Sequence, residues 1–354
     1  MQTKNHFLLI DFFKVFAALL IILHHLSSYG QIAEDARRVL PGLMTWLFEY
    51  GRYAVQIFLV MAGYLAAQSL SRYANAKFST TVLLRVIFNR YLRLFGPYSV
   101  ALLLTILCAY IARFWVADEF VGESETLGQF LAHLFFIQGI LGLDSISAGA
   151  WYIAIDWQLY TVLAILLISF PNYQAVIWVI GILAISSLLF FNRSGAYEAY
   201  FIYFIGSYGL GVLAYLAKCF NNISINRLAK FALLLIGLII LMSSFQQLWL
   251  RNILAWVVAL ALWLWGDKTY PLASRDQHLS LKVISWGSPR SYCAFLIHFA
   301  FILLANTIYI ASNLHQHESG VLAISMMLSV VLFSTAAANY LYRWVELPPM
   351  KLKV

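Results

Sequence analysis

Long apolar stretches alternate with short polar connections along the whole chain. A helix that crosses a lipid bilayer needs about 20 mostly apolar residues. Ten stretches approach or reach that length, namely 7–26, 53–70, 94–115, 150–170, 174–192, 198–218, 228–245, 249–266, 291–312 and 320–345. The pattern predicts an all-α, polytopic integral membrane protein with about ten transmembrane helices. A further apolar piece, 130–143, is short for a span, and we expect it to be re-entrant or interfacial.

The composition supports this class of protein. Of 354 residues, 62% are hydrophobic and 11% are charged, so a soluble domain could not cover itself with polar surface. No biased linker divides the chain, which predicts a single membrane-embedded domain over residues 1–354 with no appended soluble domain. The formal net charge of +8 is scattered among apolar runs, so nucleic acid is not an expected partner. Cys108, Cys219 and Cys293 show no metal-ligand spacing and are interpreted as packing residues.

Basic and acidic residues are distributed unevenly between the connections. The connection between the second and third spans has five basic residues and no acid: Arg72, Lys77, Arg85, Arg90 and Arg93. The next connection, 116–149, has five acids and no lysine or arginine: Asp118, Glu119, Glu123, Glu125 and Asp144. Because cytoplasmic loops are enriched in lysine and arginine, both termini are predicted to be cytoplasmic. In a bacterium the protein would lie in the inner membrane, as a multi-pass protein.

The first apolar stretch carries unusual polar residues. Lys14 and His25 are 11 residues apart, which places them on nearly the same face of a helix, ~16 Å apart along its axis. Asp11 lies one turn before Lys14, whereas His24 lies about 80° away and is interpreted as a packing residue. A signal peptide is the alternative for this region, but Asp11 and Lys14 interrupt its apolar run. Charged groups inside spans commonly face a functional cavity, so the stripe is a candidate site.

Four further groups stand out for the same reason. Arg90 and Arg93 are three residues apart and could bind phosphate, or could anchor the helix at the cytoplasmic face. Asp156 lies within a span and needs a partner, for which Lys14 or His25 would serve. The other candidates are His298, which could equally be a hydrogen-bonded core residue, and Glu346, which could pair with Arg343 at i,i+3 spacing. Trp151, Tyr160, Tyr292 and Arg85 flank these groups.

In order along nearly the whole chain, these motifs resemble those of the bacterial membrane acyltransferase-3 family, as a stand-alone membrane domain of the O-acetyltransferase type. The family's arginine, ten residues, histidine pattern matches Lys14 and His25. Its second-span motif matches GRYAVQIFLVMAGY, with Gly63 kept and Ala62 in place of serine. The remaining motifs match, in order, Arg90 and Arg93, then Trp151, Asp156 and Tyr160, then Ser291, Tyr292, Leu296 and His298, and finally Glu346 and Pro348. Lys14 and Asp156 depart from the family's arginine and glutamate.

The resemblance implies transfer of an acetyl or related acyl group from cytoplasmic acyl-CoA to a hydroxyl of a cell-surface or lipid-linked glycan. No permanently bound cofactor and no metal are expected, and acetyl-CoA serves as donor substrate. His25 is the expected general base, because neutral imidazole can take the hydroxyl proton. An acyl-histidine intermediate is the covalent alternative. Lys14 or Asp156 would orient the imidazole or stabilise developing charge. Arg90, Arg93 and Arg85 would bind the donor's phosphates.

Two other functions fit the intramembrane charges. A transporter or flippase of a glycan precursor would use them as a proton relay, although no inverted repeat with broken helices is evident. An inactive structural subunit of a polysaccharide machine would account for the departures at Lys14, Ala62 and Asp156. The sequence leaves open the acceptor glycan, acetyl against succinyl, and the oligomeric state, with a homodimer among the alternatives.

Overall fold

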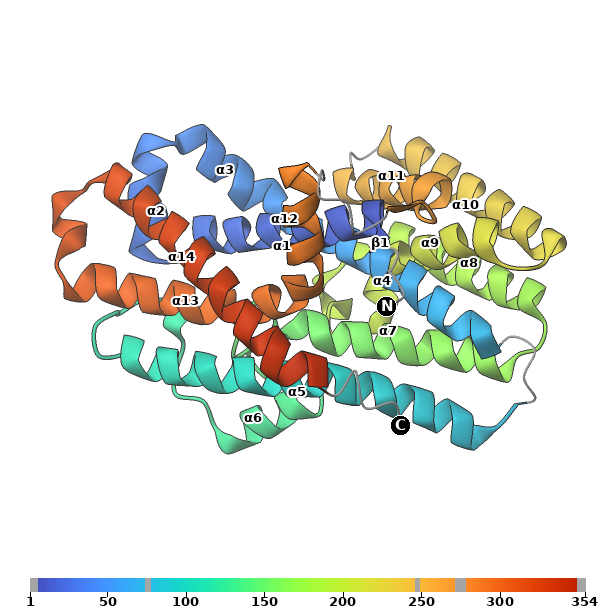
Figure 1. The fold of residues 1–354 in the computed structure, drawn as a ribbon, viewed down its shortest axis with the longest axis horizontal. Helices are drawn as coiled ribbons and strands as arrows, with labels where there is room; N and C mark the ends of the chain where they lie inside the picture. Colours follow the sequence, from blue (N-terminus) through green and yellow to red (C-terminus); the bar gives the residue numbers. More distant parts are fainter. Residues whose placement is uncertain (1–5, 74–77, 246–248, 271–277, 349–354) are drawn as a thin grey trace. The chain divides into compact units, whose positions relative to one another are not determined.

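The protein is described by a computed structural model that covers residues 6–73, 78–245, 249–270 and 278–348. Lys77, which enters the orientation argument, lies outside these residues. The α-helices are α1 (Leu8–Ser28), α2 (Gly30–Val39), α3 (Pro41–Tyr50), α4 (Ala54–Leu70), α5 (Thr80–Ala112), α6 (Leu127–Leu134), α7 (Ala150–Ser169), α8 (Tyr173–Leu189), α9 (Phe201–Cys219), α10 (Ile223–Ser244), α11 (Leu250–Trp265), α12 (Leu279–Gly287), α13 (Ser291–Ala311) and α14 (Gly320–Leu341) (Figure 1).

Short helical turns join these helices. The 3₁₀ turns are η1 (Gly51–Tyr53), η2 (Ser71–Tyr73), η3 (Glu119–Val121), η4 (Phe191–Arg193), η5 (Gly195–Tyr197), η6 (Ser288–Arg290) and η7 (Leu314–His317), and a π-helical turn, η8 (Tyr342–Glu346), ends α14. In the described chain, extended pairing is limited to β1 (His6–Phe7) and β2 (Thr269–Tyr270), which run antiparallel. The predicted all-α class is confirmed.

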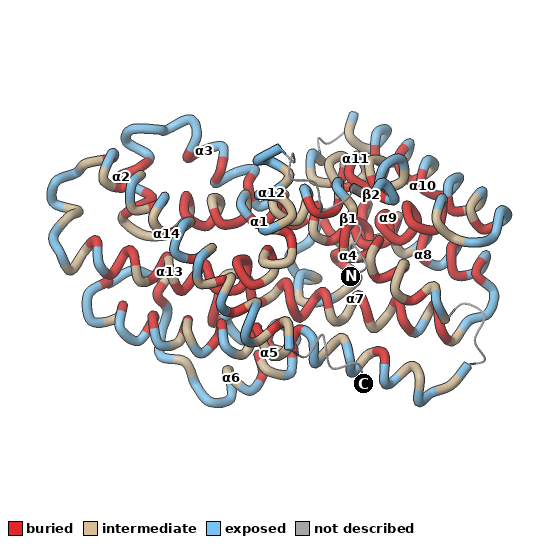
Figure 2. The backbone as a smooth tube through the Cα atoms, viewed as in Figure 1, coloured by how far each residue is buried: buried red, intermediate tan, exposed pale blue. Residues whose placement is uncertain are grey.

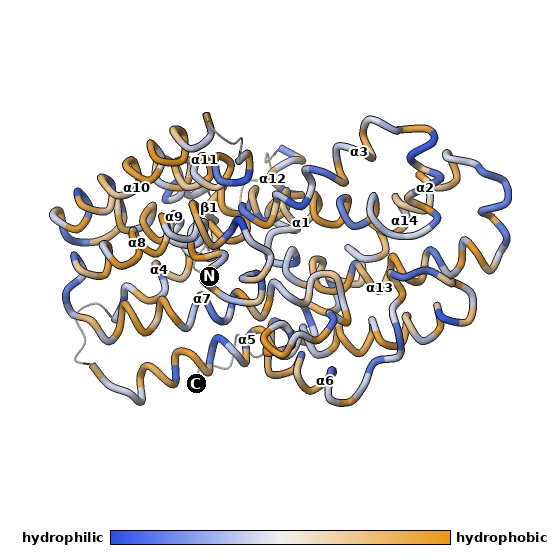
Figure 3. Tube along the Cα trace, turned by 180° about the vertical axis from the view of Figure 1, so that it is seen from behind, coloured by the Kyte–Doolittle hydropathy of each residue, from blue (hydrophilic) through white to orange (hydrophobic). Residues whose placement is uncertain are grey.

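Nine helical segments within the described ranges are long and apolar enough to cross a membrane. They correspond to nine of the ten predicted spans. The tenth, predicted at 249–266, is α11, which has 16 residues and is about 24 Å long, less than the ~30 Å of a typical hydrocarbon core. Figure 3 shows α10 and α11 as hydrophobic along most of their length.

Two predicted boundaries differ from the structure. The third span was expected from residue 94, but α5 begins at Thr80 and continues through Pro97. The arginines make the part of α5 before residue 94 too polar to be found by a search for long apolar stretches. Arginine is nevertheless a good helix former, so the helix continues through them. The ninth span was expected from residue 291, but α12 and η6 extend the helical segment back to Leu279.

The connection after α1 is helical, which the apolar pattern did not predict. α2 is rich in polar residues, yet it buries Ile32, Ala33, Asp35 and Ala36. It packs against α14 and α13, and Pro41 begins α3 at a position where a proline costs no hydrogen bond. Amphipathic helices of this kind escape a search for long apolar runs, because the polar residues of the outer face interrupt every apolar stretch.

The acidic connection 116–149 is also folded. α6 begins with a capping box in which Thr126 and Gln129 satisfy each other's backbone amides. His133 is fully buried; its Nδ1 donates to the Gln129 carbonyl at 2.8 Å, and its Nε2 accepts from the Ile146 amide at 3.1 Å. A neutral imidazole with its proton on Nδ1 satisfies both bonds. The predicted re-entrant or interfacial position of 130–143 stays a prediction.

Acidification is expected to loosen this connection. Burial lowers the pKa of His133 below its ordinary 6.5, so below pH ~6.5 the unfolded chain binds a proton that the folded form resists. The free energy of unfolding should therefore fall as the pH drops through this range and level off below the lowered pKa. Thermal unfolding from pH 7.5 to about 4.5 checks this. His133→Asn should show a smaller fall than the wild type, and equal pH dependence in both proteins would contradict the prediction.

Contacts within the chain define two compact units, each assembled from three segments. The first unit comprises Met1–Phe13, Val55–Leu92 and Tyr152–Ser285, and the second comprises Lys14–Ala54, Arg93–Trp151 and Trp286–Val354. Neither unit is one continuous stretch of sequence. The predicted organisation as a single domain over residues 1–354 stays a prediction.

In the first unit, α9 is the central helix. It packs against α8, α10 and α11, and all its residues from Tyr203 to Ala217 are buried (Figure 2). Glycines let α4 approach α9 closely: a Cβ on Gly63 would overlap the carbonyl of Tyr208, and one on Gly211 would overlap that of Val60. Gly63, the glycine of the second predicted span, is therefore required by the close contact between the α4 and α9 backbones. In the second unit, α13 packs against α14, and α2 packs against both.

Candidate active site

Two histidines from distant parts of the chain meet in the second unit. His25 lies in the last turn of α1 and His298 in α13; the two residues are 8% and 0% exposed. His25 Nδ1 is 2.6 Å from His298 Nε2. The ring planes differ by 9° and the ring centroids are 4.9 Å apart. Because the two nitrogens are much closer than the centroids, the rings meet edge to edge through a hydrogen bond.

The surroundings of His298 fix the direction of this bond. Its Nδ1 is 2.7 Å from the carbonyl oxygen of Phe295, which can only accept a hydrogen bond. His298 therefore carries its proton on Nδ1, and its Nε2 has a lone pair when the ring is neutral. That nitrogen accepts from His25 Nδ1–H, which leaves His25 Nε2 unprotonated and available as a base. A serine–histidine–aspartate triad orients its histidine in the same way.

His24, the adjacent histidine, has a different environment. Its Nδ1 donates to the carbonyl of Leu47 in α3 at 3.0 Å. Gly51 lies against its Cβ, so a side chain at position 51 would displace it. His24 thus ties α1 to α3, as expected for a packing histidine.

Aromatic rings adjoin His25 on the side of the following helix. The centroid of Tyr29 is 5.7 Å from that of His25, and Tyr29 also contacts Phe120 at 5.8 Å and Phe299 at 5.4 Å. Burial raises the pKa of Tyr29, so its hydroxyl stays protonated at neutral pH. The sequence interpretation missed this residue, although its i+4 spacing from His25 could have indicated it.

A second polar cluster in the same unit surrounds Glu346. The thiol of Cys293 donates to Glu346 Oε2 at 3.1 Å, and the positive charges of Arg93 and Lys14 act on the carboxylate. Lys14 is half-buried and Arg93 is exposed. The cluster therefore joins four residues that the sequence had treated separately: Lys14, Arg93, Cys293 and Glu346.

The structure corrects one predicted partner in this unit and adds one contact. The expected i,i+3 pair of Glu346 with Arg343 is wrong, since no such ion pair occurs in the described chain. The cause is the π-helical turn η8, whose wider winding turns residues three apart away from a shared face. Tyr292 donates its hydroxyl proton to the Leu94 carbonyl at 3.1 Å and so anchors α13 to α5.

In the first unit, Asp156 pairs with Arg90. The guanidinium Nη2 is 2.5 Å and Nε 3.2 Å from the same carboxylate oxygen of Asp156, whose side chain is 4% exposed. The guanidinium also lies over the ring of Tyr160 at 5.1 Å. Asp156 and Tyr160 are four residues apart on α7, so one helix face presents both to Arg90. The partner of Asp156 is therefore Arg90, where Lys14 or His25 was expected.

The other predicted residues occupy separate positions. Arg85 is exposed on α5, Asp11 is buried in the first unit, and Trp151 is half-buried at the start of α7 in the second unit. Among the described residues, no three side chains of histidine, cysteine, aspartate or glutamate lie together as metal ligands would. The assigned roles of Lys14, Asp156 and the three arginines stay predictions.

Comparison with known proteins adds one finding. A family model described as an acyltransferase domain, that of the acyltransferase-3 family, matches residues 7–343 and so covers nearly the whole chain. No curated protein and no solved structure matches the chain. The matched range includes both the histidine pair of the second unit and the Arg90–Asp156 pair of the first.

Proposed function

Because the chain belongs to the acyltransferase-3 family and is therefore a membrane acyltransferase, we propose that it transfers an acetyl or related acyl group from cytoplasmic acyl-CoA to a glycan hydroxyl. The acceptor is a cell-surface or lipid-linked glycan, and the membrane is a bacterial inner membrane. The observation that carries the proposal is the His25–His298 hydrogen bond, which leaves His25 Nε2 with a free lone pair.

The direct reaction needs one base. His25 Nε2 removes the proton of the acceptor hydroxyl while the hydroxyl oxygen attacks the thioester carbonyl. The carbon–sulfur bond then breaks, and the departing CoA thiolate takes the proton from the imidazolium. An ester and free CoA thiol result, and His25 returns to its neutral form. His298 keeps the His25 ring in place and accepts a stronger hydrogen bond from Nδ1–H while His25 is charged.

The covalent route uses the same nitrogen. His25 Nε2 would attack the thioester carbonyl, expel CoA as the thiolate and become an acyl-imidazolium. The glycan hydroxyl would then attack the acyl carbon, the bond from that carbon to Nε2 would break, and the hydroxyl proton would pass to the thiolate. Incubation with labelled acyl-CoA in the absence of acceptor distinguishes the two routes. Label bound to His25 supports the covalent route, and its absence during normal turnover supports direct transfer.

The remaining side chains suit the two substrates. Tyr29 offers aromatic surface beside His25, and Phe120 extends that surface from Tyr29, which fits the apolar face of a sugar ring. Arg85 and Arg93 are exposed on α5 and suit the phosphates of the donor. Arg90 is paired with the buried carboxylate of Asp156 and positions it. The hydrogen bond from His25 to His298 supports an orienting role for His298, a role that the sequence had suggested for Lys14 or Asp156.

Loss of the exposed arginines should weaken donor binding. Arg85→Gln combined with Arg93→Gln removes two charge-assisted contacts to phosphate, each worth ~1.5–3 kcal/mol. The KM for acyl-CoA is expected to rise at least about ten-fold, with kcat changed much less. The measurement is initial rate against acyl-CoA concentration in membrane vesicles. Arg227→Gln, which removes an arginine from α10, is the control, and an unchanged KM in the double variant would reduce both arginines to membrane anchors.

The activity itself can be tested in proteoliposomes. Labelled acetyl-CoA is supplied outside, and a glycan extract from the source membrane is supplied inside. The proposal predicts label in ester linkage on the glycan that depends on the protein and is released by mild alkali. Movement of unmodified glycan across the membrane without ester formation would favour the transporter alternative instead.

A further inference from the structure

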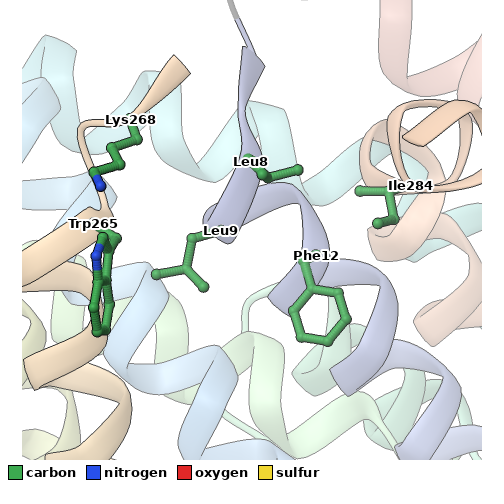
Figure 4. A pocket seen from close by; sticks show the side chains of 6 residues that line it. All are labelled: Leu8, Leu9, Phe12, Trp265, Lys268 and Ile284. Atoms are coloured by element: carbon green, nitrogen blue, oxygen red, sulfur yellow. The ribbon is translucent and has the colours of Figure 1, made fainter. Parts of the chain in front are cut away.

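A pocket of about 410 Å³ lies in the first unit, and none of its lining residues belongs to the polar clusters described above (Figure 4). It is lined by Leu8, Leu9, Phe12, Trp265, Lys268 and Ile284. The β1–β2 pairing brings the start of α1 beside the residues just after α11, and lining residues follow β1 and precede β2 in the chain. Ile284 of α12 closes the opposite side in Figure 4. The volume is within the range of small-ligand sites, ~300–1,000 Å³.

The lining surface is apolar throughout, and one charged residue contributes to it through its hydrocarbon stem. Five of the six side chains are hydrocarbon or indole, and Lys268 is the single charged residue among them. Its ammonium group lies next to the Trp265 ring at the edge of the pocket (Figure 4). The neighbouring Asp267 binds Lys218 at 2.5 Å, so its carboxylate already has a cation. The pocket thus presents a hydrocarbon interior and a cationic rim.

The pocket lies at the surface, because several of its lining side chains are exposed. Leu8, Phe12 and Trp265 are 39%, 42% and 48% exposed. Trp265 is the last residue of α11, and tryptophan and lysine at the end of an apolar helix are typical of the membrane–water interface. In a bilayer, the phosphate groups of the lipids lie at the membrane–water interface, and their hydrocarbon chains lie deeper.

We propose that the pocket is a binding site for an anionic phospholipid, with one acyl chain against Leu8, Leu9, Phe12 and Ile284 and the phosphate at Lys268. The apolar lining fits an acyl chain, and a basic rim favours an anionic headgroup over a zwitterionic one. The site is independent of the proposed acyl transfer, since it uses none of the residues assigned to donor, acceptor or base.

The experiment measures which lipids the protein retains. Purified protein is delipidated in detergent, mixed with vesicles of equal phosphatidylglycerol and phosphatidylethanolamine, repurified and analysed by native mass spectrometry. The wild type should retain phosphatidylglycerol preferentially. Lys268→Gln should lower the ratio of the two lipids about five-fold, the equivalent of ~1 kcal/mol for one basic residue. Lys268→Arg should keep the ratio.

Two further variants separate the parts of the site. Arg227→Gln removes a positive charge elsewhere in the same unit and should leave the ratio unchanged. Leu8→Trp fills the pocket from an exposed position and should reduce retention of both lipids. The proposal is overturned by an unchanged ratio in Lys268→Gln, by an equal fall in Arg227→Gln, or by full retention in Leu8→Trp. Gel filtration and thermal unfolding confirm that each variant is folded.

Discussion

His25→Ala is expected to lower the rate of acyl transfer by about 10²–10⁴-fold, the usual contribution of a general base. The variant removes the nitrogen that accepts the acceptor's proton. His298 Nε2 lies 2.6 Å from Nδ1 of the His25 ring, on the side away from Nε2, so it does not occupy the position of the lost base. The rate is measured as ester formation on the glycan at saturating acyl-CoA, with the amount of protein in the membrane determined separately.

His24→Ala is the matched control for this prediction. It removes the neighbouring imidazole from the same helix and breaks the hydrogen bond to the Leu47 carbonyl. The loss of that single bond costs ~0.5–1.5 kcal/mol of stability, which should reduce protein level more than specific activity. If His24→Ala abolishes transfer and His25→Ala retains it, the assignment of the base is wrong.

Arg90→Ala is expected to lower the free energy of unfolding by about 3–5 kcal/mol. The variant leaves the buried carboxylate of Asp156 without its cation, and an unpaired buried charge is strongly destabilising. Denaturant unfolding in detergent micelles measures the change. Arg85→Ala, an exposed arginine on the same helix, should change the free energy by less than ~0.5 kcal/mol.

A double variant separates the charge from the packing. Arg90→Met with Asp156→Leu replaces both charges by apolar groups, and such replacements are often neutral or stabilising. Its stability should therefore exceed that of Arg90→Ala. Equal stability of Arg90→Ala and Arg85→Ala would show that the Arg90–Asp156 pair contributes little to the fold.

Much of the architecture follows from hydrophobicity alone, because a bilayer requires long apolar helices. The stretches that became α1, α4, α7 to α10, α13 and α14 were recognisable on that basis. α2 and the start of α5 were missed because polar residues interrupt their apolar positions. α2 buries one face against other helices while polar residues cover the rest, and α5 extends its arginine-rich first turns beyond the apolar run.

The candidate site residues were predictable individually but not as pairs. The eleven-residue spacing from Lys14 and the position of His24 separated His25 from its neighbour, and the structure gives the two histidines the different environments expected. The bond between His25 and His298 spans 273 positions of the sequence, so spacing within one helix could not reveal it. The same holds for Arg90 and Asp156, and for Cys293 and Glu346. These contacts depend on how separate helices pack.

The protonation state of His25 is the most direct test of its role as the general base. Protein labelled with ¹⁵N at its eight histidines is reconstituted in lipid at neutral pH, and the His25 signals are identified by their absence from His25→Ala. His25 is expected to carry its proton on Nδ1, shared with His298 Nε2, and to have an unprotonated Nε2. A His25 protonated on Nε2 could not accept a proton from the acceptor hydroxyl, and that result would contradict the account.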